Sequence, residues 1–326
     1  MSTTTSSDRS SIPGVTVVVA TRDRPVLLAE ALAAICHSLR AEDRVVVVDS
    51  ASRDRRVQAV AEASGAAVLR CELPGACRAR NLGLRAVSTP IVAFTDDDCL
   101  PAPDWVAALS AAFAAHPNEA FVTGRVVADE PISGRLQIGL SLHDTSVPGH
   151  IDAGTDVSKI GHGANMAWRL EDILALGGFD ECLGPGTRLL AAEDHDLFWR
   201  ALQAGMTGTY DPLVAVRHRQ WRGRRDQLRT AHGYGVGSGA LAVKKWRVES
   251  STGPNGQVAD IPKLAWLGLA ARELGWRQGV TPMARSAGEG YAMGVISETV
   301  KLAGSLRGAA LARALPIEAG HYTRRS

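Results

Sequence analysis

The sequence has no long hydrophobic run and almost no net charge. No stretch of 18 consecutive apolar residues occurs among the 326 residues, so we predict no transmembrane helix. Lysine and arginine total 36 against 34 acidic residues, a formal net charge of +2. This near balance argues against a dedicated nucleic-acid binder. Apolar residues make up 45% of the chain, which is enough to build a sizeable buried core.

Cysteine is scarce and has no pattern. The five cysteines are scattered along the chain without a C-x-x-C pair. Neither a disulfide framework nor a zinc ribbon is indicated, and a reducing cytosol fits best. Residues 1–12 are rich in Ser and Thr and lack an apolar h-region, so we expect a disordered leader and not a signal peptide.

The first third of the chain alternates apolar strands with helices. The expected strands are 15–20, 44–48, 67–71 and 91–95, separated by helices over 26–38, over 55–64 and after Gly75. This order predicts a mainly parallel sheet with right-handed crossovers. The strand exits at Thr21, Asp49, Leu73 and Asp96 should therefore share one edge of the sheet. Asp23 or Thr21 could cap the first helix, with Pro25 near its first turn.

Three consecutive carboxylates follow the fourth strand. Asp96, Asp97 and Asp98 come directly after an apolar run. Adjacent carboxylates repel one another unless a cation relieves them, and hard oxygen ligands suit Mg²⁺ or Mn²⁺. Ligands of open α/β sheets bind beyond the carboxyl ends of strands, which is where this triplet falls. The alternative is an acidic turn that caps a helix starting near Asp104.

The middle of the chain is less regular. Residues 129–159 are rich in Gly, Ser, Pro and Asp, so we expect a mobile loop over the site. Residues 191–205 form an expected helix with Glu193 and Asp194 in its first turn and Gly205 as its C-cap. A lone Glu-Asp pair is also the usual start of a helix. A short strand over 214–216 leads to His218.

The last third is basic at first and then rich in glycine. Arg217–Arg229 holds six arginines and a single acid. This segment either contacts the phosphate of an acceptor or an anionic membrane, or is a solvated helix face. The glycines of 233–239 match a dinucleotide fingerprint only formally, because no strand precedes them, and we reject a Rossmann dehydrogenase. They permit close packing or a flexible lid. Expected helices over 261–276 and 282–315 pack on the rest of the protein or lie on a membrane.

Several segments in this order resemble a known family. They are Thr-Arg-Asp-Arg-Pro at 21–25, Val-Val-Val-Asp-Ser at 46–50, Arg-Asn-Leu-Gly at 80–83, Phe-Thr-Asp-Asp-Asp at 94–98, Asn-Met-Ala-Trp-Arg at 165–169, Gly-Gly-Phe-Asp-Glu at 177–181 and Glu-Asp-His-Asp-Leu at 193–197. Together they resemble the family 2 glycosyltransferases over about Val15 to His218. The resemblance implies the GT-A fold, a mainly parallel α/β sheet with helices on both faces. We expect a leader (1–12), a GT-A domain (13–222) and a helical C-terminal extension (223–326).

The resemblance also implies roles for particular residues. It places donor contacts at Thr21, Asp23, Asp49, Arg80, Asp96 and Asn165. It places a divalent cation, Mg²⁺ or Mn²⁺, on Asp96 and Asp98, with His218 as a further contact. Asp194 matches the catalytic base, and Glu193 and Asp180 are assigned to the acceptor side. A carboxylate at a helix N-terminus stays ionised because the helix dipole favours its charged form.

The implied activity is inverting transfer of a sugar from a nucleotide-diphosphate donor to an acceptor hydroxyl. The acceptor would be a glycan, a lipid-linked or a small-molecule compound, and the protein would be cytoplasmic or peripheral at the inner membrane face. Membrane contact would use Arg217–Arg229 and the C-terminal helices. Two alternatives are a sugar-phosphate nucleotidyltransferase and a non-catalytic nucleotide-binding module. The nucleotidyltransferase would need a Gly-rich phosphate loop after the first strand, which 21–25 lacks.

Overall fold

The computed structural model describes residues 13–129, 141–251, 289–313, 315–318 and 320–323. The expected leader (1–12) and the expected helix over 261–276 lie outside these residues. The strands are β1 (Val15–Thr21), β2 (Arg44–Ser50), β3 (Ala67–Cys71), β4 (Ile91–Asp96), β5 (Cys99–Pro101), β6 (Phe121–Ala128), β7 (Gly149–Ile151), β8 (Asn165–Arg169), β9 (Gly208–His218), β10 (Ile317–Glu318) and β11 (His321–Tyr322). The helices are α1 (Pro25–Ser38), α2 (Arg56–Ala63), α3 (Ala76–Leu84), α4 (Trp105–Ala115), α5 (Leu170–Ala175), α6 (Glu193–Gln203), α7 (Arg224–Ser251) and α10 (Glu289–Ala312), with a short 3₁₀ helix, η1 (Val157–Lys159).

One nine-stranded sheet organises the protein. Its order is β3-β2-β1-β4-β8-β6-β9-β5, and β7 pairs with β9. The first four strands pair in parallel, as the alternation of strands and helices predicted. The later strands add antiparallel pairs on either side of β8 and between β5 and β9. The α/β class is confirmed, and the sheet is mixed beyond β4.

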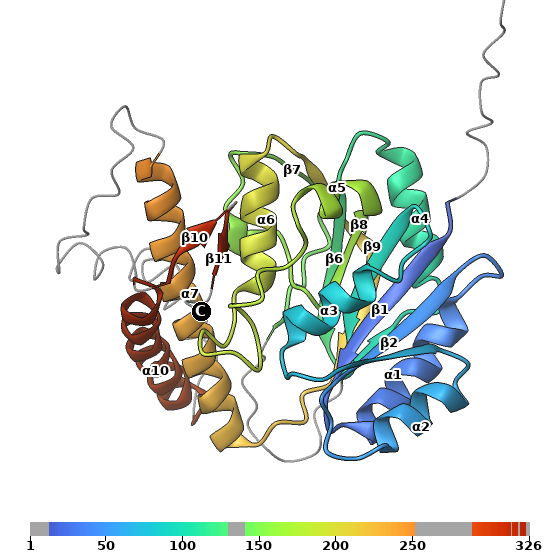
Figure 1. The fold of residues 1–326 in the computed structure, drawn as a ribbon, viewed down its shortest axis with the longest axis horizontal. Coiled ribbons are helices and arrows are strands. Elements are labelled where there is room, and N and C mark those ends of the chain that lie inside the picture. The colour runs from blue at the N-terminus through green and yellow to red at the C-terminus, as the bar shows by residue number, and fades with distance from the viewer. Residues whose placement is uncertain (1–12, 130–140, 252–288, 314, 319, 324–326) are drawn as a thin grey trace, which may run out of the picture.

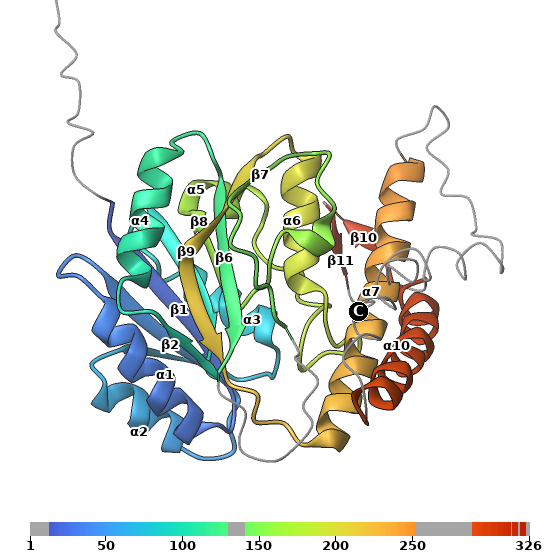
Figure 2. The ribbon, with the colours of Figure 1, turned by 180° about the vertical axis from the view of Figure 1, so that it is seen from behind.

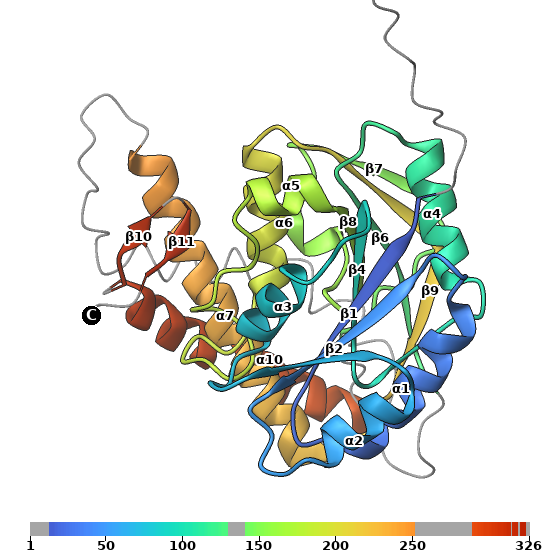
Figure 3. The same cartoon turned by 45° about the vertical axis from the view of Figure 1, so that its right-hand side comes forward.

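The alternation of valines along β1 and β2 builds two cores. Val17 and Val19 pack with residues of α1, α2 and α4, whereas Val18 packs with residues of α3, α5 and α6. Successive side chains of a strand point to opposite faces of the sheet, so a continuous apolar run suits a sheet covered on both sides. The two helical layers are visible on opposite faces of the sheet (Figure 1, Figure 2 and Figure 3).

Two local expectations were wrong. The residue that caps α1 is Arg24, without a side-chain hydrogen bond, because the side chains of Thr21 and Asp23 bind elsewhere. Thr21 donates to Asp97, and Asp23 accepts from the backbone of Arg53. The second is the loop expected over 129–159: residues 130–140 lie outside the described residues, but 141–159 contain regular structure, namely β7, η1 and a bridge between His143 and Val126.

The two C-terminal helices pack on each other through glycines. Helix α10 lies along α7 (Figure 1). A Cβ added at Gly235 or Gly239 would lie 1.9 Å from a backbone oxygen of α10. A Cβ added at Gly308 would lie 1.8 Å from a backbone oxygen of α7. The glycine run therefore permits close packing, one of the two uses that the sequence left open.

A buried lysine fixes α7 to the sheet domain. Lys244 has no exposed surface, and its Nζ lies 2.6 Å from Asp180 Oδ2 and 2.5 Å from Asp196 Oδ1. Tyr322 of β11 donates its backbone N–H to the same Asp180 oxygen at 2.6 Å. The charges of a buried triad are tolerated because each ion is paired and hydrogen-bonded. Within the described ranges, no helix is both long and apolar enough to cross a membrane.

The close approach of the two helices can be tested at Gly239. We expect Gly239→Ala to lower the free energy of unfolding by about 1–3 kcal/mol, because the new methyl group meets the Ser305 carbonyl. Thermal and urea unfolding would measure the change. Gly233→Ala on the same helix is the matched control, since its Cβ would meet only Leu190 at 3.5 Å. That variant should gain up to about 1 kcal/mol from helix propensity. Equal effects of the two variants would contradict the glycine-mediated contact.

Candidate active site

Polar residues gather where β1, β2 and β4 leave the sheet. In the parallel register Thr21 is paired with Asp49, and Ala20 is paired with Asp96. The exits of these three strands therefore lie side by side, as predicted. Asp49 is buried and accepts from the backbone N–H of Ser52 at 2.9 Å and from the Arg70 guanidinium.

The three adjacent aspartates have separate partners. Asp96 is one-third exposed and binds Arg80 at 2.8 Å. Asp97 is buried and accepts from the Thr21 hydroxyl and from Arg24, both at 2.8 Å. Burial, with the charge of Asp98 beside it, raises the pKa of Asp97 to about 6, although Arg24 opposes this shift. Asp97 thus holds the turn, and Asp96 and Asp98 point to other groups.

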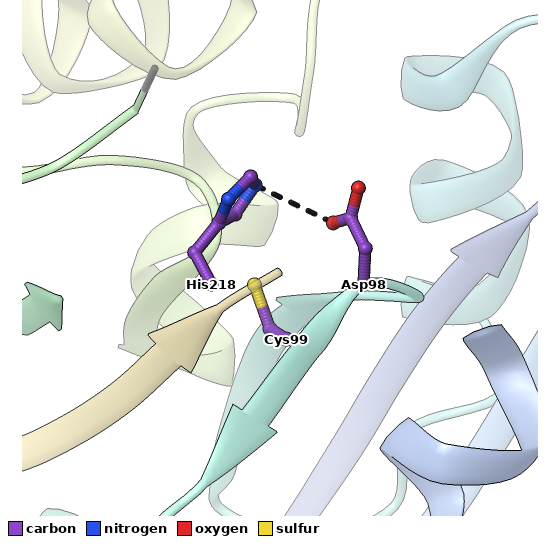
Figure 4. Close-up of side chains that lie close together, drawn as sticks. All are labelled: Asp98, Cys99 and His218. Carbon is purple, nitrogen blue, oxygen red and sulfur yellow. Dashed lines mark ion pairs between the residues drawn. The ribbon is translucent and has the colours of Figure 1, made fainter. Parts of the chain in front are cut away.

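Asp98 faces a histidine from the far end of the sheet. The antiparallel pairing of β5 and β9 sets Cys99 opposite His218. His218 Nε2 lies 3.5 Å from Asp98 Oδ1 (Figure 4). Gln220 contacts Nδ1 of the same ring at 2.8 Å. Ligand atoms of Asp98, Cys99 and His218 all lie within 4.8 Å of one another. Burial raises the pKa of the Cys99 thiol well above its ordinary value, so Cys99 stays protonated and is a poor ligand for a hard cation.

Cationic and aromatic groups cover the second oxygen of Asp98. Trp221 Nε1 donates to Asp98 Oδ2 at 2.8 Å, and Arg222 lies 3.4 Å from the same atom. Arg24 and Arg222 both lie over the Trp221 ring, at 4.8 and 4.6 Å from its centroid. Burial alone would raise the pKa of Asp98, but His218, Arg222 and the Trp221 hydrogen bond outweigh it and lower that pKa. Asp98 is therefore ionised.

Arg80 connects the acidic turn to the start of α6. It is buried and binds both Asp96 at 2.8 Å and Glu193 at 3.0 Å. Burial would lower the pKa of Arg80, but the two carboxylates outweigh it and raise that pKa. The guanidinium also lies over the Phe179 ring, 5.5 Å from its centroid. Residues from α3, β4 and α6 are held together by this single side chain.

Asp194 lies next to this bridge. Its Oδ2 accepts from the backbone N–H of Gly163 at 2.8 Å, and its Oδ1 accepts from that of His195 at 2.8 Å. A Cβ added at Gly163 would lie 3.4 Å from Asp194 Cβ and 3.7 Å from an Arg80 nitrogen. Burial tends to raise the pKa of Asp194. The neighbouring His195 and His162 and the two backbone donors outweigh burial and lower it. Asp194 is thus an ionised carboxylate beside Arg80, the residue that binds Asp96.

Two residues assigned to the site from the sequence have other roles. Asn165 has no exposed surface; it accepts from Trp105 Nε1 and donates to the carbonyls of Arg125 and Val214. These bonds use its amide to join strands, which does not fit a donor contact. Asp180 is fully buried by Lys244 and Tyr322, which does not fit an acceptor contact. The Thr21 hydroxyl donates to Asp97 and stays at the end of β1 beside Asp49.

Sequence reasoning missed several residues near the site. Arg24, Trp221 and Arg222 all contact the Asp97–Asp98 turn. The only signal for the last two was the arginine-rich segment, interpreted as a surface for a phosphate or a membrane. Tyr234 of α7 hydrogen-bonds Ser141, and burial raises its pKa to about 12. No pattern in the sequence marked it.

This geometry agrees with comparisons to known proteins. Residues 16–151 match the model of glycosyl transferase family 2. The chain is also 31% identical over 244 residues to the pre-mycofactocin glycosyltransferase of Mycobacterium tuberculosis. Residues 16–151 belong to the family 2 glycosyltransferases. That alignment covers 71% of this chain and 48% of the relative, so the chain spans about half the length of the relative. Chondroitin synthase of Escherichia coli is 28% identical over 168 residues, or 49% of this chain and 24% of that protein.

Solved structures show that this family 2 member has the GT-A fold. The mannosyltransferase PcManGT of Pyrobaculum calidifontis, solved with GDP-Man and Mn²⁺, superposes with a TM-score of 0.59 at 22% identity. The superposition covers 92% of this chain and 88% of the mannosyltransferase chain. TarS of S. aureus, solved with UDP-GlcNAc, superposes with a TM-score of 0.54 at 15% identity and covers 96% of each chain.

The bridge made by Arg80 can be tested through stability. We expect Arg80→Met to lower the free energy of unfolding by about 3 kcal/mol, because it leaves Asp96 and buried Glu193 without their common cation. Urea unfolding followed by circular dichroism would measure this. Arg85→Met, at an exposed position one helical turn later, is the control and should change little. A change in Arg80→Met no larger than in the control would contradict the role of the bridge.

Proposed function

We propose that this protein is an inverting glycosyltransferase that moves a sugar from a nucleoside-diphosphate donor to an acceptor hydroxyl. The observation that carries the proposal is the chain of contacts from Asp96 through Arg80 to Glu193 and its neighbour Asp194. It brings the acidic strand exit and the first turn of α6 into one region. Inversion requires the acceptor to attack the anomeric carbon opposite the leaving diphosphate, so a base and a phosphate-stabilising site must face one donor sugar.

Asp194 is the residue that we assign as the base. A general base has to be unprotonated at the working pH and within hydrogen-bond reach of the acceptor hydroxyl. The lowered pKa of Asp194 keeps it ionised through the neutral range. Its two backbone donors fix the direction of the carboxylate and leave further lone pairs for the acceptor proton. Glu193, paired with Arg80, positions this turn and does not act as the base.

The opposite side of the site would stabilise the departing diphosphate. Asp98 and His218 offer a carboxylate and an imidazole side by side, a donor set that fits Mn²⁺ better than Mg²⁺, which prefers oxygen ligands. Such a cation would supply positive charge to the leaving phosphates. Arg24 and Arg222 lie on the same aspartate turn and would add guanidinium contacts to an anion there. Thr21, Asp23 and Asp49 stand at the neighbouring strand ends, where we place the nucleoside.

The donor and acceptor classes follow from the relatives only in outline. Structural neighbours bind GDP-Man, UDP-GlcNAc and UDP, which supports a nucleotide sugar as donor here. The acceptor would be a glycan, a lipid-linked compound or a small molecule. Peripheral contact with the inner membrane face through 217–229 stays a prediction. Four of the six arginines there are engaged in ion pairs, namely Arg217, Arg219, Arg222 and Arg229.

The base assignment can be tested at Asp194. We expect Asp194→Asn to lower kcat by about 10²–10⁴-fold, because an amide cannot take the acceptor proton. Donor binding, measured by isothermal titration with nucleotide sugars, should change little. Turnover would be measured as the release of nucleoside diphosphate. The matched control is Asp54→Asn, at an exposed position. Turnover of Asp194→Asn close to that of the control would contradict the assignment of Asp194 as the base.

The cation site can be tested at Asp98. We expect Asp98→Ala to abolish Mn²⁺ binding, because the carboxylate that faces His218 is gone. Equilibrium dialysis with Mn²⁺ would measure binding, and transfer should fall with it. Asp104→Ala, an exposed aspartate six residues later, should bind Mn²⁺ as the unchanged protein does. Retention of full Mn²⁺ affinity by Asp98→Ala would place the cation elsewhere.

A further inference from the structure

A second group of metal-ligand side chains surrounds Asp194. Ligand atoms of His162, Asp194 and His195 all lie within 4.8 Å of one another. The two imidazole rings stack with centroids 6.3 Å apart. This group is separate in composition from Asp98, Cys99 and His218, because it has two imidazoles and one carboxylate and no thiol. The roles described above assign no ligand to either imidazole ring.

The hydrogen bond of His162 leaves one ring nitrogen free to bind a metal. Its Nε2 lies 3.2 Å from the carbonyl oxygen of Leu142. A carbonyl oxygen can only accept, so Nε2 carries the proton and Nδ1 of the neutral ring has a lone pair. Metal-binding histidines commonly donate their second N–H to a carbonyl in this way, which fixes the tautomer and the ring.

His195 has an unused nitrogen at the same place. Within the described part of the chain, its Nε2 is buried and makes no hydrogen bond. A buried polar atom without a partner costs about 1–3 kcal/mol. Its backbone N–H binds Asp194 Oδ1, so the residue is fixed at the first turn of α6 while its ring nitrogen is unsatisfied. A metal ion would satisfy that nitrogen.

The ligand types decide which ions fit. Two imidazoles and one carboxylate suit Zn²⁺, Co²⁺ or Ni²⁺, whereas Mg²⁺ prefers oxygen ligands alone. Around Zn²⁺ the ligand atoms of a tetrahedron would be about 3.3 Å apart, given metal–ligand distances of about 2.0–2.1 Å. The three side chains would have to close by about 1.5 Å at most from their present separation.

We infer that His162, Asp194 and His195 form a second metal site, selective for Zn²⁺-like ions and distinct from the site at Asp98. Three protein ligands leave the fourth tetrahedral position open. The site contains the carboxylate that we assign as the base. A bound Zn²⁺ would therefore keep Asp194 from taking the acceptor proton and would stop transfer. Only this consequence rests on the proposed function; the metal site itself does not.

The probe for this site is Co²⁺, whose visible absorption reports tetrahedral nitrogen and oxygen coordination. The titration uses the full chain, and any Co²⁺ bound at the site of Asp98 and His218 is common to all the variants compared. We expect the unchanged protein to bind one Co²⁺ more than His162→Gln/His195→Gln does, and Zn²⁺ to displace it. Asp194→Asn should weaken that Co²⁺ binding on the order of 10–100-fold. Circular dichroism without metal would check that each variant is folded.

The matched control removes two other imidazoles. His37→Gln/His116→Gln changes two exposed histidines and should bind Co²⁺ as the unchanged protein does. Equal Co²⁺ binding by the two double variants, both folded, would overturn the inference. Zn²⁺ inhibition of transfer that a chelator reverses would support the consequence for the base. Co²⁺ binding lost with the two site histidines, in a protein that transfers no sugar, would uphold the metal site and refute the proposed function.

Discussion

The structure depends most on one buried cation, the guanidinium of Arg80. It binds the partly exposed Asp96 of the strand exit and the buried Glu193 of the α6 start. A buried ion is stable only when its charges are compensated, so Arg80 requires both carboxylates and they require it. The same contact holds Asp194 in place, because Asp194 follows Glu193 on the helix and lies close to Arg80 through Gly163. The position of the proposed base therefore follows from an electrostatic requirement of the core.

The second buried cation, Lys244, plays the same part for the C-terminal extension. It pairs with Asp180 and Asp196, and Asp196 also binds Arg200. Helix α6 thus has Arg80 bound at its first residue and Lys244 bound one turn later. The glycine-to-backbone contacts between α7 and α10 bring those helices close enough to pack as one layer beside α6. The extension is in this way part of the support of the site, in agreement with the packing alternative for the C-terminal helices.

The aspartate turn shows how three adjacent carboxylates can coexist. Each has its own guanidinium: Arg80 for Asp96, Arg24 for Asp97 and Arg222 for Asp98, which also faces the His218 ring. Repulsion between the acids is offset by groups from α3, from the start of α1 and from the end of β9. A diphosphate with its metal would enter a region where these positive groups are already gathered. Charge balance and ligand binding use the same side chains.

The sequence by itself determined the alternation of strands and helices, the parallel pairing of the first four strands, the acids at the end of β4 and the acids at the start of α6. Those features are local, since a valine run, an Asp triplet or an acidic first turn of a helix is readable without knowledge of distant partners. Only the tertiary structure decided which acids remain available. Asn165 makes buried hydrogen bonds and Asp180 makes a buried ion pair, so neither is available to a ligand. Asp98, in contrast, lies beside His218 because β5 pairs with β9. The physical reason is that every buried polar group must find a partner, and that partner is chosen by the packing of elements far apart in the chain.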